Sequence, residues 1–119
     1  MELINATNLR SFKGHFNSFS KIQKLKILGT TLLWEIPPEI VMDMRELHEL
    51  DLRGNLLRHM KPELLKGPLE LQRVYLSDNR WDCSNGGLDW LAMEPGNGTV
   101  RRRIIDYDDL LCDHQLYIG

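Results

Sequence analysis

Apolar residues recur at a fixed spacing along most of the chain. Three segments, 22–32, 47–57 and 71–81, carry an apolar residue at their first, fourth, sixth and eleventh positions. The near-equal spacing of these segments indicates stacked repeats, and the alternation of apolar and polar residues at the fourth to sixth positions predicts a short strand in each copy. We therefore expect a row of short strands with their apolar side chains turned inward.

The ninth position of each copy is polar. It holds Asn55 and Asn79 in two copies and Thr30 in the other full copy. An asparagine side chain can satisfy backbone groups that a tight bend leaves unpaired, and a threonine hydroxyl can do part of this. We therefore expect a sharp turn after each strand, with the polar side chain inside it.

The segments between the predicted strands contain further apolar residues, which we expect to anchor the chain to the core. They are Phe12, Phe16 and Phe19, then Ile36, Ile40 and Met44, then Met60, Leu64 and Leu65. Pro37, Pro38 and Pro62 exclude strands here and favour short helical or 3₁₀ turns.

A partial copy of the pattern precedes the first full one. Ile4, Thr7 and Leu9 fall on its sixth, ninth and eleventh positions, in the same spacing as Ile27, Thr30 and Leu32. Glu2 would then occupy an apolar position, so we expect this first strand to be incomplete.

Composition narrows the class of protein. The 119 residues suit one domain or a piece of a longer array, and 42% hydrophobic with 27% charged residues suit a folded chain. Leucine is enriched to about twice its ordinary share. A net charge of -2 argues against a nucleic-acid binder that relies on bulk charge. The sequence lacks the roughly 18 consecutive apolar residues of a membrane-spanning helix, so we expect no membrane insertion by this segment.

The three copies resemble the leucine-rich repeat family, and the resemblance covers nearly the whole chain. It implies an α/β solenoid with a short parallel sheet on the concave face and irregular or short helical returns on the convex face. It also implies binding of a protein ligand or co-receptor. The N-terminal end lacks a covering segment, so we expect preceding repeats or another chain to contact that edge.

After Asn79 the period breaks, and the chain resembles the cysteine-containing C-terminal cap of extracellular leucine-rich repeat proteins, such as Toll-like and neuronal receptors. That cap reads N-P-W-x-C-x-C, then L-x-W-L on a helix, then two later cysteines. Here Arg80 replaces the proline and one cysteine of each pair remains. The resemblance implies a single bridge between Cys83 and Cys112, the alternative being two buried free thiols. It divides the chain into repeats over 1–78 (one partial, two full and the start of a fourth) and a cap over 79–119.

The cellular compartment is open from the sequence. The first five residues lack the pattern of a signal peptide, which fits a cytosolic protein or a mature or truncated chain. Glycosylation sequons begin at Asn5 and Asn97, and with a disulfide they favour an extracellular or cell-surface location.

The candidate ligand-binding residues are the polar strand positions that a solenoid places on its concave face. They are Lys24, Lys26, His48, Asp51, Arg53, Arg73 and Tyr75. Arginine and tyrosine are common interface anchors, so the last three are the strongest candidates. The alternative is an ordinary solvated surface.

Catalytic and metal-binding motifs are not found, so we expect no enzymatic activity, metal or cofactor. The basic triplet Arg101–Arg103 is expected to be solvated and paired with the acidic residues 106–109, and Tyr107 to be structural.

Two other functions remain open. The run 34–40 resembles that of intracellular repeat scaffolds that bind signalling proteins, and the chain could also serve only to end a longer array.

Overall fold

The structure is a computed structural model, and it describes residues 2–4, 21–28, 41, 44–83, 88–92 and 99–112. Both sequons, at Asn5 and Asn97, lie outside the described residues, as do Thr30 and the run 34–40. The predicted anchors at Phe12, Phe16, Phe19, Ile36 and Ile40 also lie outside them.

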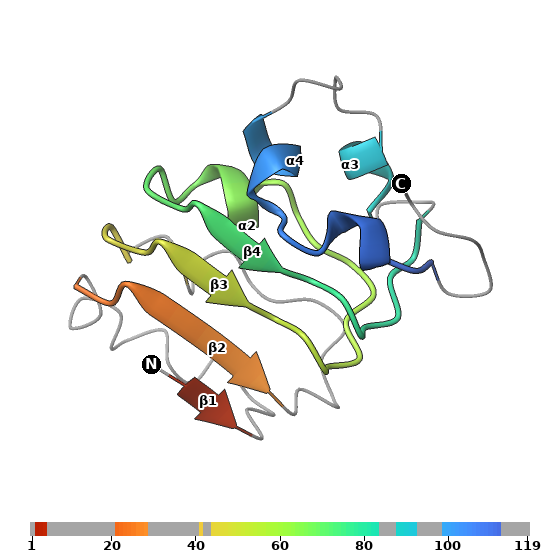
Figure 1. Cartoon of the computed structure of the whole chain (residues 1–119), viewed down its shortest axis with the longest axis horizontal. Coiled ribbons are helices and arrows are strands. Elements are labelled where there is room, and N and C mark those ends of the chain that lie inside the picture. Colours follow the sequence, from red (N-terminus) through yellow and green to blue (C-terminus); the bar gives the residue numbers. More distant parts are fainter. Residues whose placement is uncertain are drawn as a thin grey trace.

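Four short strands form one parallel sheet in the order β1-β2-β3-β4, as Figure 1 shows. The strands are β1 (Glu2–Ile4), β2 (Lys24–Leu28), β3 (Glu49–Asp51) and β4 (Arg73–Tyr75). The short helices are α2 (Glu63–Lys66), α3 (Asp89–Ala92), α4 (Thr99–Arg103) and the 3₁₀ turn η2 (Tyr107–Asp109). After each strand the chain returns to the end of the sheet at which that strand began, so consecutive strands are neighbours and run parallel.

The register of β2, β3 and β4 confirms the repeat spacing read from the sequence. Leu25 pairs with Leu50, and Leu50 pairs with Val74. These residues all occupy the fourth position of their copies, so equivalent positions of successive copies are neighbours in the sheet.

The register predicted for the N-terminal copy is wrong by one residue. Leu3, rather than Ile4, pairs with Ile27, and Ile4 pairs with Leu28. Because the side-chain period of a strand is two, this shift moves Glu2 out of the row of apolar positions. Glu2 instead pairs in register with Lys26. β1 is a strand of three residues, as long as β3 and β4, although the sequence pattern predicted an incomplete one.

The predicted apolar positions make the core. The following are at most 1% exposed: Leu25, Ile27, Leu47, Leu50, Leu52, Leu57, Leu71, Val74, Leu76 and Trp81. The return residues Met44, Met60, Leu64 and Leu65 are buried to the same degree. Pro62 directly precedes α2, which agrees with the predicted helical turn.

The turn after each of β3 and β4 has one residue in the left-handed backbone region. That residue directly precedes the asparagine of the ninth position: Gly54 has φ 76° and Asp78 has φ 59°. Glycine adopts this conformation without steric cost, and aspartate is among the few other residues that tolerate it. The Gly54 N–H donates to the Asp78 carbonyl at 3.1 Å, which ties the two turns together.

A C-terminal segment, described over 88–92 and 99–112, lies beyond β4 (Figure 1). Its apolar side chains extend the core: Leu88, Leu91, Val100, Ile104 and Leu110 are all buried. The Trp90 indole N–H donates to the Met60 carbonyl at 2.8 Å. α3 falls on the predicted L-x-W-L run, so the helix expected there is present.

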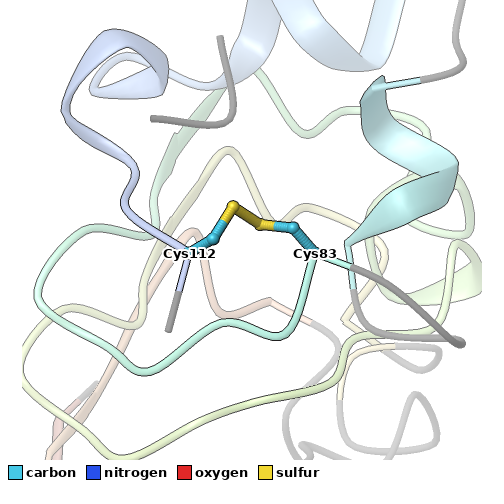
Figure 2. Close-up of a disulfide and its surroundings, with 2 residues drawn as sticks. All are labelled: Cys83 and Cys112. Atoms are coloured by element: carbon cyan, nitrogen blue, oxygen red, sulfur yellow. A yellow bond between two sulfur atoms is a disulfide. The ribbon is translucent and has the colours of Figure 1, made fainter. Parts of the chain in front are cut away.

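A disulfide joins Cys83 to Cys112, with their Cα atoms 5.5 Å apart (Figure 2). This is the pairing that the resemblance implied, and the separation is ordinary for a disulfide. Trp81 forms an isolated parallel bridge with Cys112. The bond therefore fixes the end of the C-terminal segment beside the end of the last repeat.

Candidate functional site

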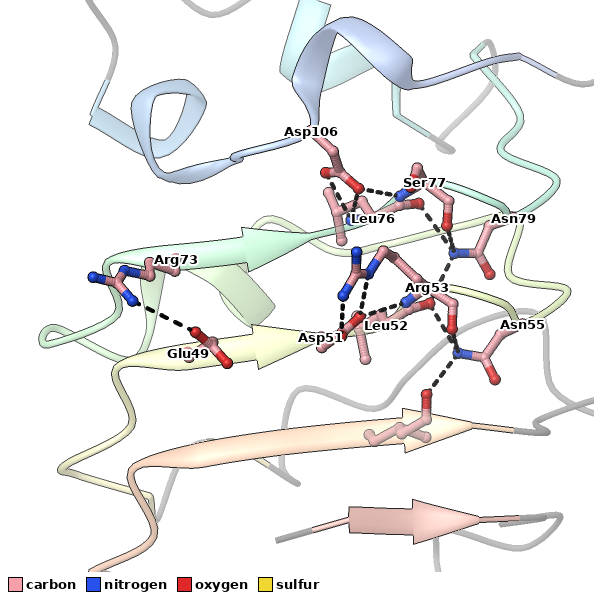
Figure 3. A network of polar contacts seen from close by, with 11 residues as sticks. Glu49, Asp51, Leu52, Arg53, Asn55, Arg73, Leu76, Ser77, Asn79 and Asp106 are labelled. Carbon is pink, nitrogen blue, oxygen red and sulfur yellow. Dashed lines mark hydrogen bonds and ion pairs between the residues drawn. The ribbon is translucent and has the colours of Figure 1, made fainter.

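Two asparagines link the turns of successive repeats (Figure 3). The Asn55 amide donates to the Ile27 carbonyl at 2.9 Å and to the Leu52 carbonyl at 2.8 Å. The Asn79 amide repeats this arrangement one strand further, donating to Leu52 at 2.8 Å, and its Oδ1 accepts from the Leu57 N–H at 3.1 Å. The role expected for the ninth position is thus confirmed for both asparagines.

We call the polar side of the sheet, opposite the core, the outer face. Its strand positions are Lys24, Lys26, Glu49, Asp51, Arg73 and Tyr75. The register arranges them in two rows, Lys24–Glu49–Arg73 and Lys26–Asp51–Tyr75. Acidic side chains on the middle strand thus stand between basic or aromatic ones, a favourable pattern across neighbouring strands.

Asp51, Arg53 and Tyr75 form a compact cluster on the outer face. Arg53 holds both oxygens of the Asp51 carboxylate, with Nε–Oδ1 at 3.0 Å and Nη2–Oδ2 at 2.8 Å. Its guanidinium carbon also lies 4.5 Å from the centre of the Tyr75 ring. A two-point contact to the carboxylate combined with a cation–π contact fixes the arginine in one orientation.

Asp51 is the most buried charged residue among those described, with 7% of its surface exposed. Burial by itself raises the pKa of this carboxyl. The hydrogen bonds from the Arg53 side chain and backbone N–H, with the charges of Arg53 and Lys26, outweigh burial and hold the pKa of Asp51 below its ordinary value. The same pairing raises the pKa of Arg53.

The other predicted ligand-binding residues lie around this cluster. The Arg73 side chain is 63% exposed, and its Nη1 lies 3.9 Å from the Glu49 carboxylate. His48 precedes β3, and its carbonyl accepts N–H groups from both Gln72 and Arg73. All seven predicted ligand-binding residues therefore lie on or next to the outer face, and Asp51, Arg53 and Tyr75 are in mutual contact.

Sequence reasoning did not identify the part played by Asp106. Its carboxylate accepts the Leu76 N–H at 3.0 Å and the Ser77 N–H at 2.8 Å (Figure 3). In the preceding repeat, the equivalent N–H of Leu52 donates to the Tyr75 carbonyl of the next strand. At Leu76, Asp106 thus takes the place of the carbonyl that a further strand would supply. The N–H of Arg53, which is equivalent to that of Ser77, donates instead to the Asp51 side chain of its own repeat. No local pattern in the sequence could have indicated the part played by Asp106, because the donors lie about 30 positions earlier in the chain.

The basic triplet is more structural than expected. Arg101 lies over the Tyr107 ring, with its guanidinium carbon 4.4 Å from the ring centre, and Arg103 Nη1 donates to the Leu65 carbonyl at 3.3 Å. Tyr107 is buried, as expected for a structural residue. The predicted pairing of this triplet with the acidic residues 106–109 is not seen: among the described residues no ion pair joins them, and the Asp106 carboxylate is engaged by backbone N–H groups.

Within the described part of the chain, no group of three or more His, Cys, Asp or Glu side chains is placed to hold a metal ion. Among the helices described, none has the length and apolar character needed to cross a membrane.

Comparison with known proteins agrees with the repeat pattern. A family model described as leucine rich repeat matches residues 20–80, more than half of the chain. The matched range contains β2, β3 and β4 with both asparagines. A search of curated proteins finds no match.

Proposed function

Because the chain belongs to the leucine-rich repeat family, we propose that it is a non-enzymatic protein-recognition module of an extracellular receptor or secreted protein. In this proposal residues 1–78 are the last repeats of a solenoid and 79–119 are its C-terminal cap. The outer face is the concave surface, and it binds a protein ligand or co-receptor.

The cluster of Asp51, Arg53 and Tyr75 is the observation that carries the proposal. Arginine and tyrosine contribute much of the binding energy of protein interfaces. Here Arg53 is held by Asp51 and by the Tyr75 ring before any partner arrives. A side chain that is already ordered loses less conformational entropy on binding, so the cluster is well suited to an interface.

The disulfide supports the extracellular part of the proposal. Disulfides persist in oxidising compartments and are rare in the cytosol. The bond Cys83–Cys112 holds a segment whose apolar residues cover the β4 side of the core, which is the task of a terminal cap. Glycans on Asn97 and Asn5 are part of the same proposal.

A screen against purified extracellular protein domains tests ligand binding. The chain is tetramerised, and each interaction found is measured again with the double variant Arg73→Glu plus Tyr75→Ala. We expect affinity to fall at least tenfold, because one change reverses a charge and the other removes an aromatic anchor. The matched control Arg58→Glu, an exposed arginine outside the outer face, should leave affinity unchanged. Unaltered binding by a correctly folded double variant would refute the role of this face.

Intact mass tests the compartment. The chain is expressed in eukaryotic cells with an added signal peptide, and the secreted protein is weighed with and without reduction and alkylation. We expect a Cys83–Cys112 bridge and a glycan on Asn97. Free thiols and bare asparagines would favour the alternative, an intracellular scaffold for a signalling protein.

A further inference from the structure

We propose that Ile105 completes the binding surface of the outer face, so that Ile105, Tyr75 and Arg73 form one composite patch. The patch takes a protein segment that presents an apolar side chain next to an acidic one. This inference rests on the proposed function and adds both a residue of the C-terminal segment and the chemistry of the partner.

The backbone places Ile105 at the edge of β4. Ile104 forms a parallel bridge with Val74, and the Ile105 N–H donates to the Val74 carbonyl at 2.9 Å. Val74 is 0% exposed and Ile104 is 4% exposed, so both point into the core. Ile105 is the next residue and is 56% exposed, so its side chain faces away from the core, beside the end of β4 that carries Tyr75.

Ile105 is one of the exposed large apolar side chains of the described residues, together with Leu56, Leu69 and Leu111. It is 56% exposed, although its neighbours Ile104 and Tyr107 are buried. The backbone around it is firmly held, because the adjacent Asp106 carboxylate accepts two N–H groups of the β4 turn. A large apolar side chain that is both exposed and rigidly placed suits an interface, since ordering it on binding loses little entropy.

The charge of the outer face indicates which kind of partner side chain would lie beside the apolar contact. The face with Arg53 carries four cationic side chains (Lys24, Lys26, Arg53, Arg73) and two carboxylates (Glu49, Asp51), within a chain whose net charge is -2. Arg53 is engaged by Asp51, whereas Arg73 is 63% exposed and lies 3.9 Å from Glu49. A partner carboxylate beside Arg73 would therefore be favoured by charge complementarity.

The spacing of the two anchors sets the form of the partner. Arg73 and Tyr75 are two positions apart on one strand, which separates them by about 7 Å. In an extended segment, side chains two positions apart lie on the same face and span that distance. The patch therefore selects an acidic residue and an aliphatic or aromatic one on the same face of the segment.

A displayed library of short random peptides, selected on the intact chain, tests this inference. We expect the selected peptides to share Asp or Glu two positions from a large apolar residue. Binding of synthetic copies, measured by calorimetry, should weaken at least tenfold with Ile105→Asp and with Arg73→Glu. A peptide whose acidic residue is changed to lysine should regain affinity for Arg73→Glu, which shows that this variant is folded.

Matched controls separate the patch from general effects. Leu69→Asp replaces another exposed aliphatic side chain, which is 84% exposed and lies outside the outer face. Arg58→Glu reverses the charge of another exposed arginine. Both should bind within twofold of the parent. If Arg73→Glu plus Tyr75→Ala abolishes binding while Ile105→Asp does not, the composite patch is wrong and the proposed function stands. If none of these changes weakens binding, both are wrong. Selected peptides that share no carboxylate would contradict the prediction that the partner presents an acidic residue.

Discussion

At the scale of single residues, Asp51 shows how a charge is accommodated on a largely buried site. Taking a carboxylate out of water is unfavourable unless its oxygens are hydrogen bonded. Arg53 supplies three such bonds, two from its side chain and one from its backbone N–H at 3.1 Å. The carboxylate therefore stays ionised and organises the arginine that we place in the binding surface.

The pairing makes stability depend on pH in a defined direction. Because the pKa of Asp51 is lower in the folded protein than in the unfolded chain, its contribution is complete above the ordinary pKa of an aspartate. The contribution is lost as pH falls through the lower, folded pKa. We expect Asp51→Asn to reduce the free energy of unfolding by about 1 kcal/mol at neutral pH, with the difference from the parent shrinking in acid.

Urea denaturation of the parent and of Asp51→Asn, from neutral pH down to below the ordinary pKa of an aspartate, measures the effect. The exposed Glu70 offers a control, since Glu70→Gln should change stability by less than about 0.5 kcal/mol. A difference between parent and Asp51→Asn that stays constant with pH would contradict the linkage to this carboxyl.

At the scale of elements, the turns are joined by two asparagines, of which Asn55 is buried and Asn79 is half-buried. Asn55 is 4% exposed and donates to carbonyls of two different repeats, at Ile27 and Leu52. Removing its amide leaves these carbonyls without that donor in a place that water does not reach. Asn55 thus adds a side-chain link to the backbone pairing that joins β2 and β3.

We expect Asn55→Ala to lower the free energy of unfolding by about 2 kcal/mol, since buried acceptors lose their partners. Thermal denaturation followed by circular dichroism measures the loss. Gln72→Ala, at an exposed position beside β4, should have almost no effect. If Asn55→Ala costs no more than such a surface change, the amide is not needed for stability.

A second feature at the scale of elements is the edge of β4 that does not pair with β3. Exposed strand edges invite pairing with other chains, and proteins usually cover them. Residues 104–106 cover this one by a bridge, a backbone hydrogen bond and a carboxylate. A short piece of chain thus completes the edge.

Replacing Asp106 by alanine should expose part of this edge. We expect the amides of Leu76 and Ser77 to exchange with deuterium at least tenfold faster, because their acceptor is gone. Asp108→Ala, an exposed change in the neighbouring η2 turn, provides the control. Unchanged exchange at both amides would mean that the carboxylate does not protect them.

At the scale of the whole molecule, one core runs from the repeats into the C-terminal segment. Trp81 is almost fully buried, and its indole N–H donates to the Leu76 carbonyl at 2.7 Å. The disulfide begins two positions later, at Cys83, and ties this point to Cys112. The repeats and the segment beyond them are therefore expected to unfold together.

Replacing both cysteines by serine should lower the free energy of unfolding by about 3–4 kcal/mol, on a chain-entropy argument. Denaturant unfolding with and without a reductant checks this. The parent should lose a similar amount on reduction, whereas the double variant should not respond. A parent protein that is insensitive to full reduction would contradict the stabilising role of the bond.

The sequence predicts the parts of this fold that repeat. Period and polarity place Leu25, Leu50 and Val74 correctly, because each copy obeys the same packing requirement. The first copy is misplaced by one position, since Leu3 and Ile4 are both apolar and only pairing with β2 distinguishes them. Asp106 is missed for a related reason: its function depends on backbone donors far earlier in the chain, and no local pattern encodes that.

The occupied edge of β4 also limits how such a chain can change length in evolution. Between β2 and β4, equivalent positions of successive repeats pair in the same register, so duplication of one such unit would meet neighbours that fit it. A duplicated unit placed after β4 would compete with Asp106 for the N–H group of Leu76. We therefore expect new repeats to be accommodated upstream of β4, with the C-terminal boundary staying where this carboxylate lies.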